Sequence, residues 1–162
     1  MSTMGRGRAR LASATLAKEV HAPRKRKVPL QEQVRVLVAD DDVDIRQTVR
    51  AVLEDEGYQV DEASNGKISL ELIRAATEPY VVVLDLMMPL LGGSAVLRAI
   101  SQDEKLSQRH TVLMVTASTY AIEAALSELL QSLQIPLIRK PFDLDLLVYC
   151  VEKAAERIAL GA

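Results

Sequence analysis

Four short apolar runs recur along the chain, and each is followed by a polar or charged side chain. The runs cover residues 34–39, 81–84, 111–115 and 136–139. Consecutive apolar residues predict strands buried on both faces, as in a parallel sheet. The polar groups that end these runs are, in chain order, Asp40, Asp41 and Asp42, then Asp85, Thr116 and Lys140. Since ligands in open α/β sheets bind beyond the carboxyl ends of strands, we expect one site at one edge of one sheet.

Helical periodicity fills the intervals between these strands. The expected helices lie around residues 45–53, 68–73, 96–100, 121–133 and 144–159. Asp42 or Asp44 can cap the first helix, and Gly57 stands where that helix should end. Residues 58–63 alternate between apolar and polar, which predicts a fifth strand at or near the sheet edge. Five strands and five helices in alternation predict an α/β fold, a doubly wound five-stranded parallel sheet with right-handed crossovers.

Charge divides the 162 residues into two segments. Residues 1–33 contain eight Lys and Arg but only two Glu, whereas residues 34–162 carry a net charge of −8. We therefore predict a basic, disordered N-terminal extension over 1–33 and one folded domain over 34–160. Two alternatives stay open for this extension: the basic run from Arg24 to Lys27 could bind the phosphates of nucleic acid or anionic lipid, and the acid-poor start of the chain resembles an organelle transit peptide.

Cysteine content and hydropathy limit the compartment. Cys150 is the single cysteine, so no internal disulfide can form and a reducing compartment fits best. No apolar run approaches the roughly 20 residues that a bilayer requires, and the N-terminus lacks the apolar core of a secretory signal. We therefore expect a cytoplasmic protein.

The polar groups at the predicted strand ends favour phosphoryl chemistry around a metal ion. Carboxylates of Asp40, Asp41 and Asp85 that converge would repel one another, and a cation would relieve that repulsion. Oxygen ligands favour a hard ion, so Mg²⁺ is expected rather than Zn²⁺. Lys140 would neutralise phosphate oxygens and Thr116 would donate a hydrogen bond to another. Asp85 is then the candidate nucleophile, which would form an acyl phosphate.

The motifs at these strand ends resemble those of one known family. Residues 36–42 read Val-Leu-Val-Ala-Asp-Asp-Asp, 83–89 read Val-Leu-Asp-Leu-Met-Met-Pro, 115–117 read Val-Thr-Ala and 140–142 read Lys-Pro-Phe. In this order and at these intervals they resemble the receiver domain of two-component response regulators. The resemblance covers the chain from Val34 to about Ala159 and implies a flavodoxin-like, CheY-like (βα)5 fold.

The resemblance also implies residue roles and partners. Asp85 would be the phosphoacceptor, taking a phosphoryl group from a sensor histidine kinase or a histidine phosphotransfer protein. Mg²⁺ would be held by Asp40, Asp41, Asp85 and the backbone carbonyl of Met87. Thr116 and Lys140 would contact the phosphoryl group, and the bond from Lys140 to Pro141 would be cis. The expected outcome is a change in binding of a downstream protein.

One residue and one short segment depart from the pattern of the resembled family. Leu137 stands where an aromatic residue usually reports phosphorylation, and residues 131–136 replace the usual turn before that strand. These departures leave phosphate acceptance possible but put the usual aromatic switch and output face in doubt. No DNA-binding domain is apparent after Ala159, so the resemblance implies a single-domain regulator for which nucleic acid is not the expected partner.

Two alternatives to a phosphorylation-controlled binding module stay open. A Mg²⁺-dependent phosphohydrolase with an aspartyl nucleophile, similar to haloacid dehalogenases, would need a second Asp two residues after the first, where this chain has Met87. A receiver that has lost signalling would serve as a phosphorylation-independent scaffold, which the intact acidic, Thr and Lys positions argue against. His21 and His110 lack the helical context of a phosphodonor histidine. We therefore expect a protein that is not an enzyme.

Overall fold

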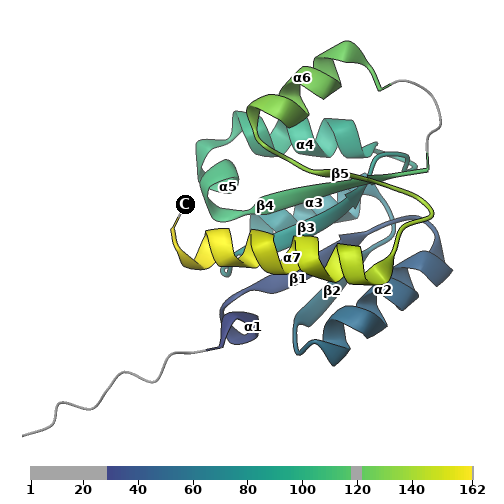
Figure 1. The fold of residues 1–162 in the computed structure, drawn as a ribbon. Helices are drawn as coiled ribbons and strands as arrows, with labels where there is room; N and C mark the ends of the chain where they lie inside the picture. Colours follow the sequence, from purple (N-terminus) through teal and green to yellow (C-terminus); the bar gives the residue numbers. More distant parts are fainter. Residues whose placement is uncertain (1–28, 118–121, 162) are drawn as a thin grey trace, which may run out of the picture.

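The protein, in a computed structural model that describes residues 29–117 and 122–161, contains one five-stranded parallel sheet. The strands are β1 (Arg35–Ala39), β2 (Gln59–Ala63), β3 (Tyr80–Asp85), β4 (Thr111–Thr116) and β5 (Leu137–Arg139). Their order across the sheet is β2-β1-β3-β4-β5, so the chain moves to one side of β1 and then to the other (Figure 1). The predicted doubly wound α/β fold is confirmed, and the edge strand predicted over 58–63 is β2, which begins one residue later at Gln59.

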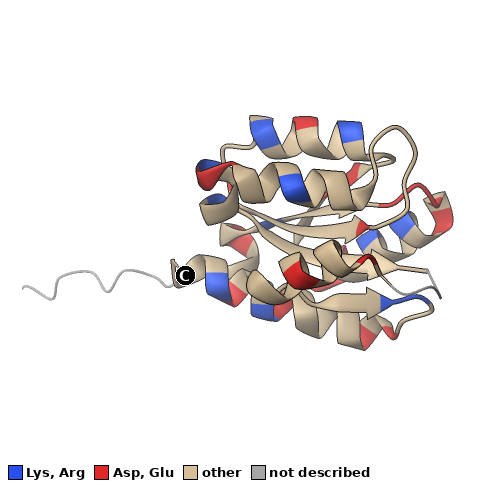
Figure 2. Cartoon of the chain, turned by 90° about the horizontal axis from the view of Figure 1, so that it is seen from above, with Lys and Arg blue, Asp and Glu red and all other residues tan. Residues whose placement is uncertain are grey.

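Helices cover both faces of this sheet. Within the described residues they are α1 (Leu30–Gln33), α2 (Val43–Asp55), α3 (Gly66–Ala75), α4 (Gly93–Gln102), α5 (Glu104–Arg109), α6 (Ala124–Ser132) and α7 (Leu144–Ala159). One face packs against α2 and α7, with α1 at its margin, and the other packs against α3, α4, α5 and α6. Charged residues lie mostly on the helices and loops around a largely uncharged sheet (Figure 2).

Alternation along the strands divides the core into two layers. Val36, Val38, Val81 and Val83 point to the α2–α7 side, whereas Leu37, Val82 and Leu84 point to the α3–α4 side. Because successive strand side chains face opposite ways, a strand apolar at every position needs helices on both sides. Continuous apolar runs are therefore the cause of the doubly covered sheet.

The expectation of five helices is wrong, because the described residues contain two further short helices, α1 and α5. One of them is α5, a separate helix that starts directly after α4. It starts there because the Asp103 carboxylate accepts hydrogen bonds from the backbone N–H groups of Lys105 and Leu106, at 3.0 and 3.2 Å. The α1 helix lies in the stretch predicted as a disordered extension, and its Leu30 packs against the core on the α7 side. The folded unit thus includes residues before Val34.

Other predicted boundaries differ by a few residues. The helix expected over 121–133 occupies Ala124–Ser132, and position 121 lies outside the described residues. The basic run from Arg24 to Lys27 and His21 also lie outside them. The last helix has the predicted bounds, Asp42 caps α2, and Gly57 ends that helix with a φ of 91°. A positive φ of this size is free of steric cost in glycine, which explains the residue type there.

The register of the sheet places the polar groups at one edge. Ala39 pairs with Leu84, and Asp85 pairs with Val115, so Asp40, Asp85 and Thr116 follow one another across neighbouring strands. The start of α4 lies directly against this edge, because a Cβ on Gly93 would overlap the backbone oxygen of Asp85. Only glycine permits that approach without a shift of the strand end.

Candidate functional site

Three carboxylates converge at the carboxyl edge of the sheet. Asp40 and Asp41 follow β1, Asp85 ends β3, and one oxygen from each lies within 4.8 Å of the others. Asp40 and Asp85 are buried, whereas Asp41 is exposed. The structure therefore brings together the three acidic residues that the sequence predicted as one cluster.

Asp40 is held at its backbone and at both carboxylate oxygens. Its N–H donates to the carbonyl of Ala63 on β2, at 3.1 Å, which extends the pairing of β1 and β2 by one residue. Its Oδ1 accepts from the backbone N–H of Asp42 at 2.9 Å, and its Oδ2 accepts from Lys140 Nζ at 2.6 Å. Asp42 in turn caps α2. These bonds fix the direction in which the Asp40 carboxylate points.

Lys140 reaches the same cluster from the end of β5, the strand at the opposite edge of the sheet from β2. Its Nζ lies 2.6 Å from Asp40 Oδ2 and 3.4 Å from Asp85 Oδ2. Its backbone N–H donates to the carbonyl of Thr116 at 2.8 Å, and its peptide bond to Pro141 is cis. Burial lowers the pKa of Lys140, but the hydrogen bond that Lys140 donates to Asp40 and the charge of Asp85 outweigh burial and raise that pKa. The ammonium therefore stays charged and partly offsets the acidic cluster.

Asp85 lies in an environment that opposes its negative charge. Burial raises the pKa of Asp85, and the charge of Asp40 raises it further. Lys140 and a 3.4 Å hydrogen bond from the backbone N–H of Met87 act in the opposite direction without cancelling the rise. One ammonium thus leaves the repulsion among three carboxylates incompletely compensated, and a further cation would be favoured here.

The donor atoms fit a hard divalent ion. In the part of the chain that the structure describes, the metal-competent cluster consists of carboxylates alone, without His or Cys. Mg²⁺ prefers oxygen ligands and usually combines one or two carboxylates with water and phosphate oxygens. The exposure of Asp41 leaves one side of the cluster open to such groups. Asp40, Asp41 and Asp85 could therefore hold Mg²⁺.

Two further predicted residues stand on the same edge. Thr116 is buried at the end of β4, one residue past the Val115 that pairs with Asp85. Met87 follows Asp85 in the β3–α4 loop, with 66% of its surface exposed, and its N–H contacts the Asp85 carboxylate. Ligation by the Met87 carbonyl and a contact from Thr116 to a phosphoryl group stay predictions.

Leu137, the residue in place of the usual aromatic, lies against the core. It is half-buried, pairs with Met114 across the sheet and packs against the apolar layer on the α3–α4 side.

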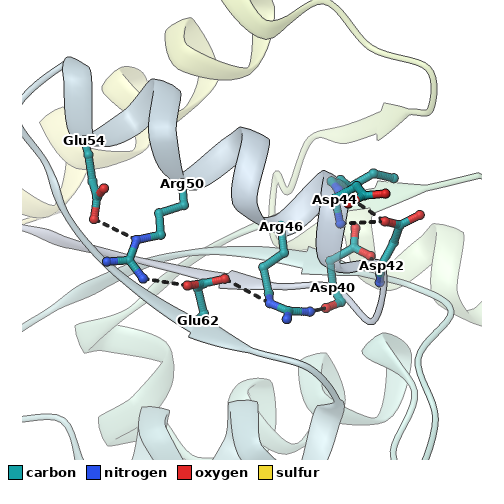
Figure 3. Close-up of polar contacts among 8 residues, drawn as sticks. Asp40, Asp42, Asp44, Arg46, Arg50, Glu54 and Glu62 are labelled. Atoms are coloured by element: carbon teal, nitrogen blue, oxygen red, sulfur yellow. Dashed lines mark hydrogen bonds and ion pairs between the residues drawn. The ribbon is translucent and has the colours of Figure 1, made fainter.

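Sequence reasoning missed Arg46 and Glu62. Arg46, on the first turn of α2, donates from Nη1 to the backbone oxygen of Asp40 at 2.7 Å and from Nε to Glu62 Oε1 at 3.0 Å (Figure 3). The four-residue spacing between Asp42 and Arg46 places the two residues on one helix face, but it does not indicate that Arg46 donates to the backbone oxygen of Asp40. Its partner Glu62, on β2, cannot be inferred from that spacing.

Among residues 29–117 and 122–161, no helix has the length and apolar character needed to cross a membrane.

Comparison with known proteins places the chain among response regulators. Residues 36–152 match the family model of the response regulator receiver domain. The chain is 33% identical over 124 residues to response regulator RR06 of Streptococcus pneumoniae, which covers 76% of this chain and 54% of that protein. It is 31% identical over 122 residues to regulatory protein AtoC of Escherichia coli, which covers 75% of this chain and 25% of that protein. The chain thus spans about half, or less, of the length of these relatives.

Solved structures agree with this assignment. The receiver domain of the Francisella response regulator 1452 is similar with a TM-score of 0.65 and 31% identity, over 76% of this chain and 97% of that one. A CheY-like response regulator receiver domain protein from Methanospirillum hungatei is similar with a TM-score of 0.62 and 29% identity, over 80% and 97% of the two chains. With strand order, motifs and relatives in agreement, this chain belongs to the response regulator receiver domain family of two-component systems.

Proposed function

We propose that this receiver accepts a phosphoryl group on Asp85, from a phosphohistidine of a sensor histidine kinase or a histidine phosphotransfer protein, and that this changes its binding to a downstream partner. The observation that carries the proposal is the convergence of Asp40, Asp41 and Asp85 within 4.8 Å, beside the ammonium of Lys140. Scattered carboxylates could not share one phosphoryl group and one ion.

In the proposed reaction, the phosphoryl group moves from a histidine nitrogen of the donor to a carboxylate oxygen of Asp85. An ionised oxygen of Asp85 forms a bond to phosphorus while the bond from phosphorus to the imidazole nitrogen breaks, and the electron pair of that bond stays on the imidazole. Bound Mg²⁺ would shield the charges of the carboxylates and the incoming phosphoryl oxygens from one another. Asp40, Asp41, Asp85 and the Met87 carbonyl are the proposed ligands.

Lys140 and Thr116 are the proposed contacts of the transferred group. Lys140 Nζ already bridges Asp40 and Asp85, so a short movement would bring it to a phosphoryl oxygen. The Thr116 hydroxyl would donate to another oxygen, since Thr116 ends the neighbouring strand. Any change in shape would have to arise without the usual aromatic, since Leu137 stands in its place.

The site fits the two alternatives, a phosphohydrolase and a phosphorylation-independent scaffold, less well. A phosphohydrolase would need an acid two residues beyond the nucleophile, and the exposed residue there is Met87. A phosphorylation-independent scaffold would have no need for three convergent carboxylates, those of Asp40, Asp41 and Asp85, which repel one another without a cation. We therefore propose a binding module rather than an enzyme. A cytoplasmic location belongs to the same proposal, because the expected donor kinase domains act there and Cys150 is unpaired by any disulfide.

Labelling with acetyl phosphate and Mg²⁺ tests the proposal. Intact-mass spectrometry should detect one added phosphoryl group on the wild-type protein and none on Asp85→Asn, whose amide cannot form the acyl phosphate. Rapid release of phosphate over many turnovers would favour the phosphohydrolase, and an unlabelled wild-type protein would favour the scaffold. Labelling of Asp85→Asn at the wild-type level would refute Asp85 as phosphoacceptor.

A further inference from the structure

Arg46 connects the acidic site to the edge strand of the sheet. Its guanidinium donates to the Asp40 backbone oxygen at 2.7 Å and to the Glu62 carboxylate at 3.0 Å (Figure 3). The side chain is only 15% exposed, so both bonds lie in a partly dehydrated setting where hydrogen bonds to charged groups are stronger. Through these two bonds Arg46 contacts the backbone of Asp40 and the side chain of Glu62, and not the carboxylates that would bind a metal.

The oxygen that Arg46 holds belongs to the peptide unit between Asp40 and Asp41. A peptide unit is planar and moves as one body, so a fixed oxygen fixes the direction in which the chain leaves Asp40. The N–H of Asp40 is fixed independently by the carbonyl of Ala63. Between these two anchors, Asp40 keeps its carboxylate toward Lys140, and the exposed Asp41 begins from a defined backbone position.

A row of charges keeps the Arg46 guanidinium in place. Glu62 accepts from Arg46 through Oε1 and from Arg50 through Oε2, the second bond being 2.6 Å long. Arg50 also donates to Glu54 at 2.8 Å, near the far end of α2. The planar fork of an arginine can serve Glu62 and the Asp40 oxygen at once, whereas the single ammonium of lysine is poorly suited to both.

We infer that Arg46 is a positioning residue of the proposed Mg²⁺ site, which acts by fixing the Asp40–Asp41 peptide and so sets the affinity for the ion. This inference rests on the proposed function. Groups that orient metal ligands typically change metal affinity by roughly 10–100-fold when they are removed. Arg46 does not contact the Asp85 carboxylate in the bonds described, so the phosphorylation step itself should proceed normally once the site is filled.

Calorimetric titration with Mg²⁺ tests this role. We expect Arg46→Met to raise the Kd for Mg²⁺ by roughly tenfold and Arg46→Lys to raise it less. Arg50→Met is the matched control, because Arg50 lies on the same helix and binds the same Glu62 but has Glu54 as its other partner. Its Kd should rise far less than that of Arg46→Met, because Arg50 does not donate to the Asp40 backbone oxygen in the bonds described. An unchanged Kd in Arg46→Met, or an equal rise in both Met variants, would overturn the inference.

Labelling with acetyl phosphate gives a second measurement. In Arg46→Met, the Mg²⁺ concentration for half-maximal labelling should rise by the same factor as the Kd, while the rate at saturating Mg²⁺ stays that of the wild-type protein. A lower saturating rate with an unchanged half-saturation point would mean that Arg46 does not act through the ion. Should Arg46→Met fail to fold, Arg46→Lys carries both measurements, and a wild-type Kd in that variant would overturn the inference.

The same titration distinguishes a failure of the role given to Arg46 from a failure of the proposed Mg²⁺ site. A wild-type protein that binds no Mg²⁺ would refute the proposed metal site and the role of Arg46 together. A wild-type protein that binds Mg²⁺, beside an Arg46→Met variant that binds it equally well, would refute the role of Arg46 alone.

Discussion

Lys140 Nζ lies 2.6 Å from Asp40 Oδ2, although the two residues are 100 positions apart in the sequence. Lys140 follows the edge strand β5 and Asp40 follows β1, so the lysine extends past the ends of β4 and β3 to reach it. On that path its ammonium also comes within 3.4 Å of Asp85. One cation thus joins two carboxylates from separate strands, while the exposed Asp41 adds a third negative charge.

Replacement of Lys140 by Met should destabilise the protein in the absence of divalent ions. Loss of one partner leaves the buried Asp40 and Asp85 without their cation, and breaking a buried pair typically costs about 3–5 kcal/mol. Urea unfolding with a chelator present measures the free energy of unfolding. Lys67→Met, at an exposed position on α3, is the control and should stay near the wild-type value. A Lys140→Met variant as stable as wild type would contradict this account of the charges.

Mg²⁺ should stabilise the folded protein, and Asp41→Asn should weaken that effect. An ion that binds only the folded state adds about 1.4 kcal/mol at ten times its Kd. Asp41 is exposed, so its amide variant should fold normally without the ion. Thermal unfolding at increasing Mg²⁺ measures the shift in Tm for both proteins. Equal shifts in Asp41→Asn and the wild-type protein would exclude Asp41 as a ligand.

Gly93 and its neighbour Gly92 should respond differently to alanine. A Cβ at Gly93 would overlap the Asp85 backbone oxygen, whereas a Cβ at Gly92 would lie 3.6 Å from the Leu86 oxygen, an ordinary contact. Overpacking of this kind typically costs about 1–3 kcal/mol. We expect Gly93→Ala to lose stability of that order in urea unfolding and to label more slowly with acetyl phosphate, while Gly92→Ala changes little. Similar losses in the two variants would show that the α4–β3 contact is not what requires glycine.

His110 should make the protein less stable as the pH falls from 7 to 5. Burial, and secondarily the charge of Arg109, lowers the pKa of His110 to about 4, from an ordinary value of 6.5. The unfolded chain therefore takes up a proton below pH 6.5 that the folded protein excludes until about pH 4. The stability lost by pH 5 is about 2 kcal/mol.

The control for this pH effect is His110→Asn. Tyr80 donates its N–H to His110 Nδ1 at 3.1 Å, and the Asn oxygen can accept that bond without titrating. Urea unfolding at both pH values should show a smaller difference in this variant. If its stability falls between pH 7 and 5 as much as that of the wild-type protein, another group is responsible.

The sequence allowed the fold and the acidic site to be predicted because both depend on strand ends. Apolar runs identified β1, β3 and β4, and a parallel sheet must bring Asp40, Asp85 and Thr116 to one edge. The α5 helix was missed because its start depends on a single cap at Asp103 after a helix that had already ended. Arg46 was missed because its partner Glu62 becomes a neighbour only when β2 pairs with β1.

The central claim is that Asp85 receives the phosphoryl group, and the most direct measurement is where that group goes after transfer. A phosphorylated histidine phosphotransfer protein would be mixed with this receiver and Mg²⁺, followed by reduction with borohydride, which converts an aspartyl phosphate to homoserine. Peptide mass spectrometry should then find homoserine at position 85 and at no other aspartate. Transfer that leaves position 85 as aspartate and modifies another residue would contradict the account.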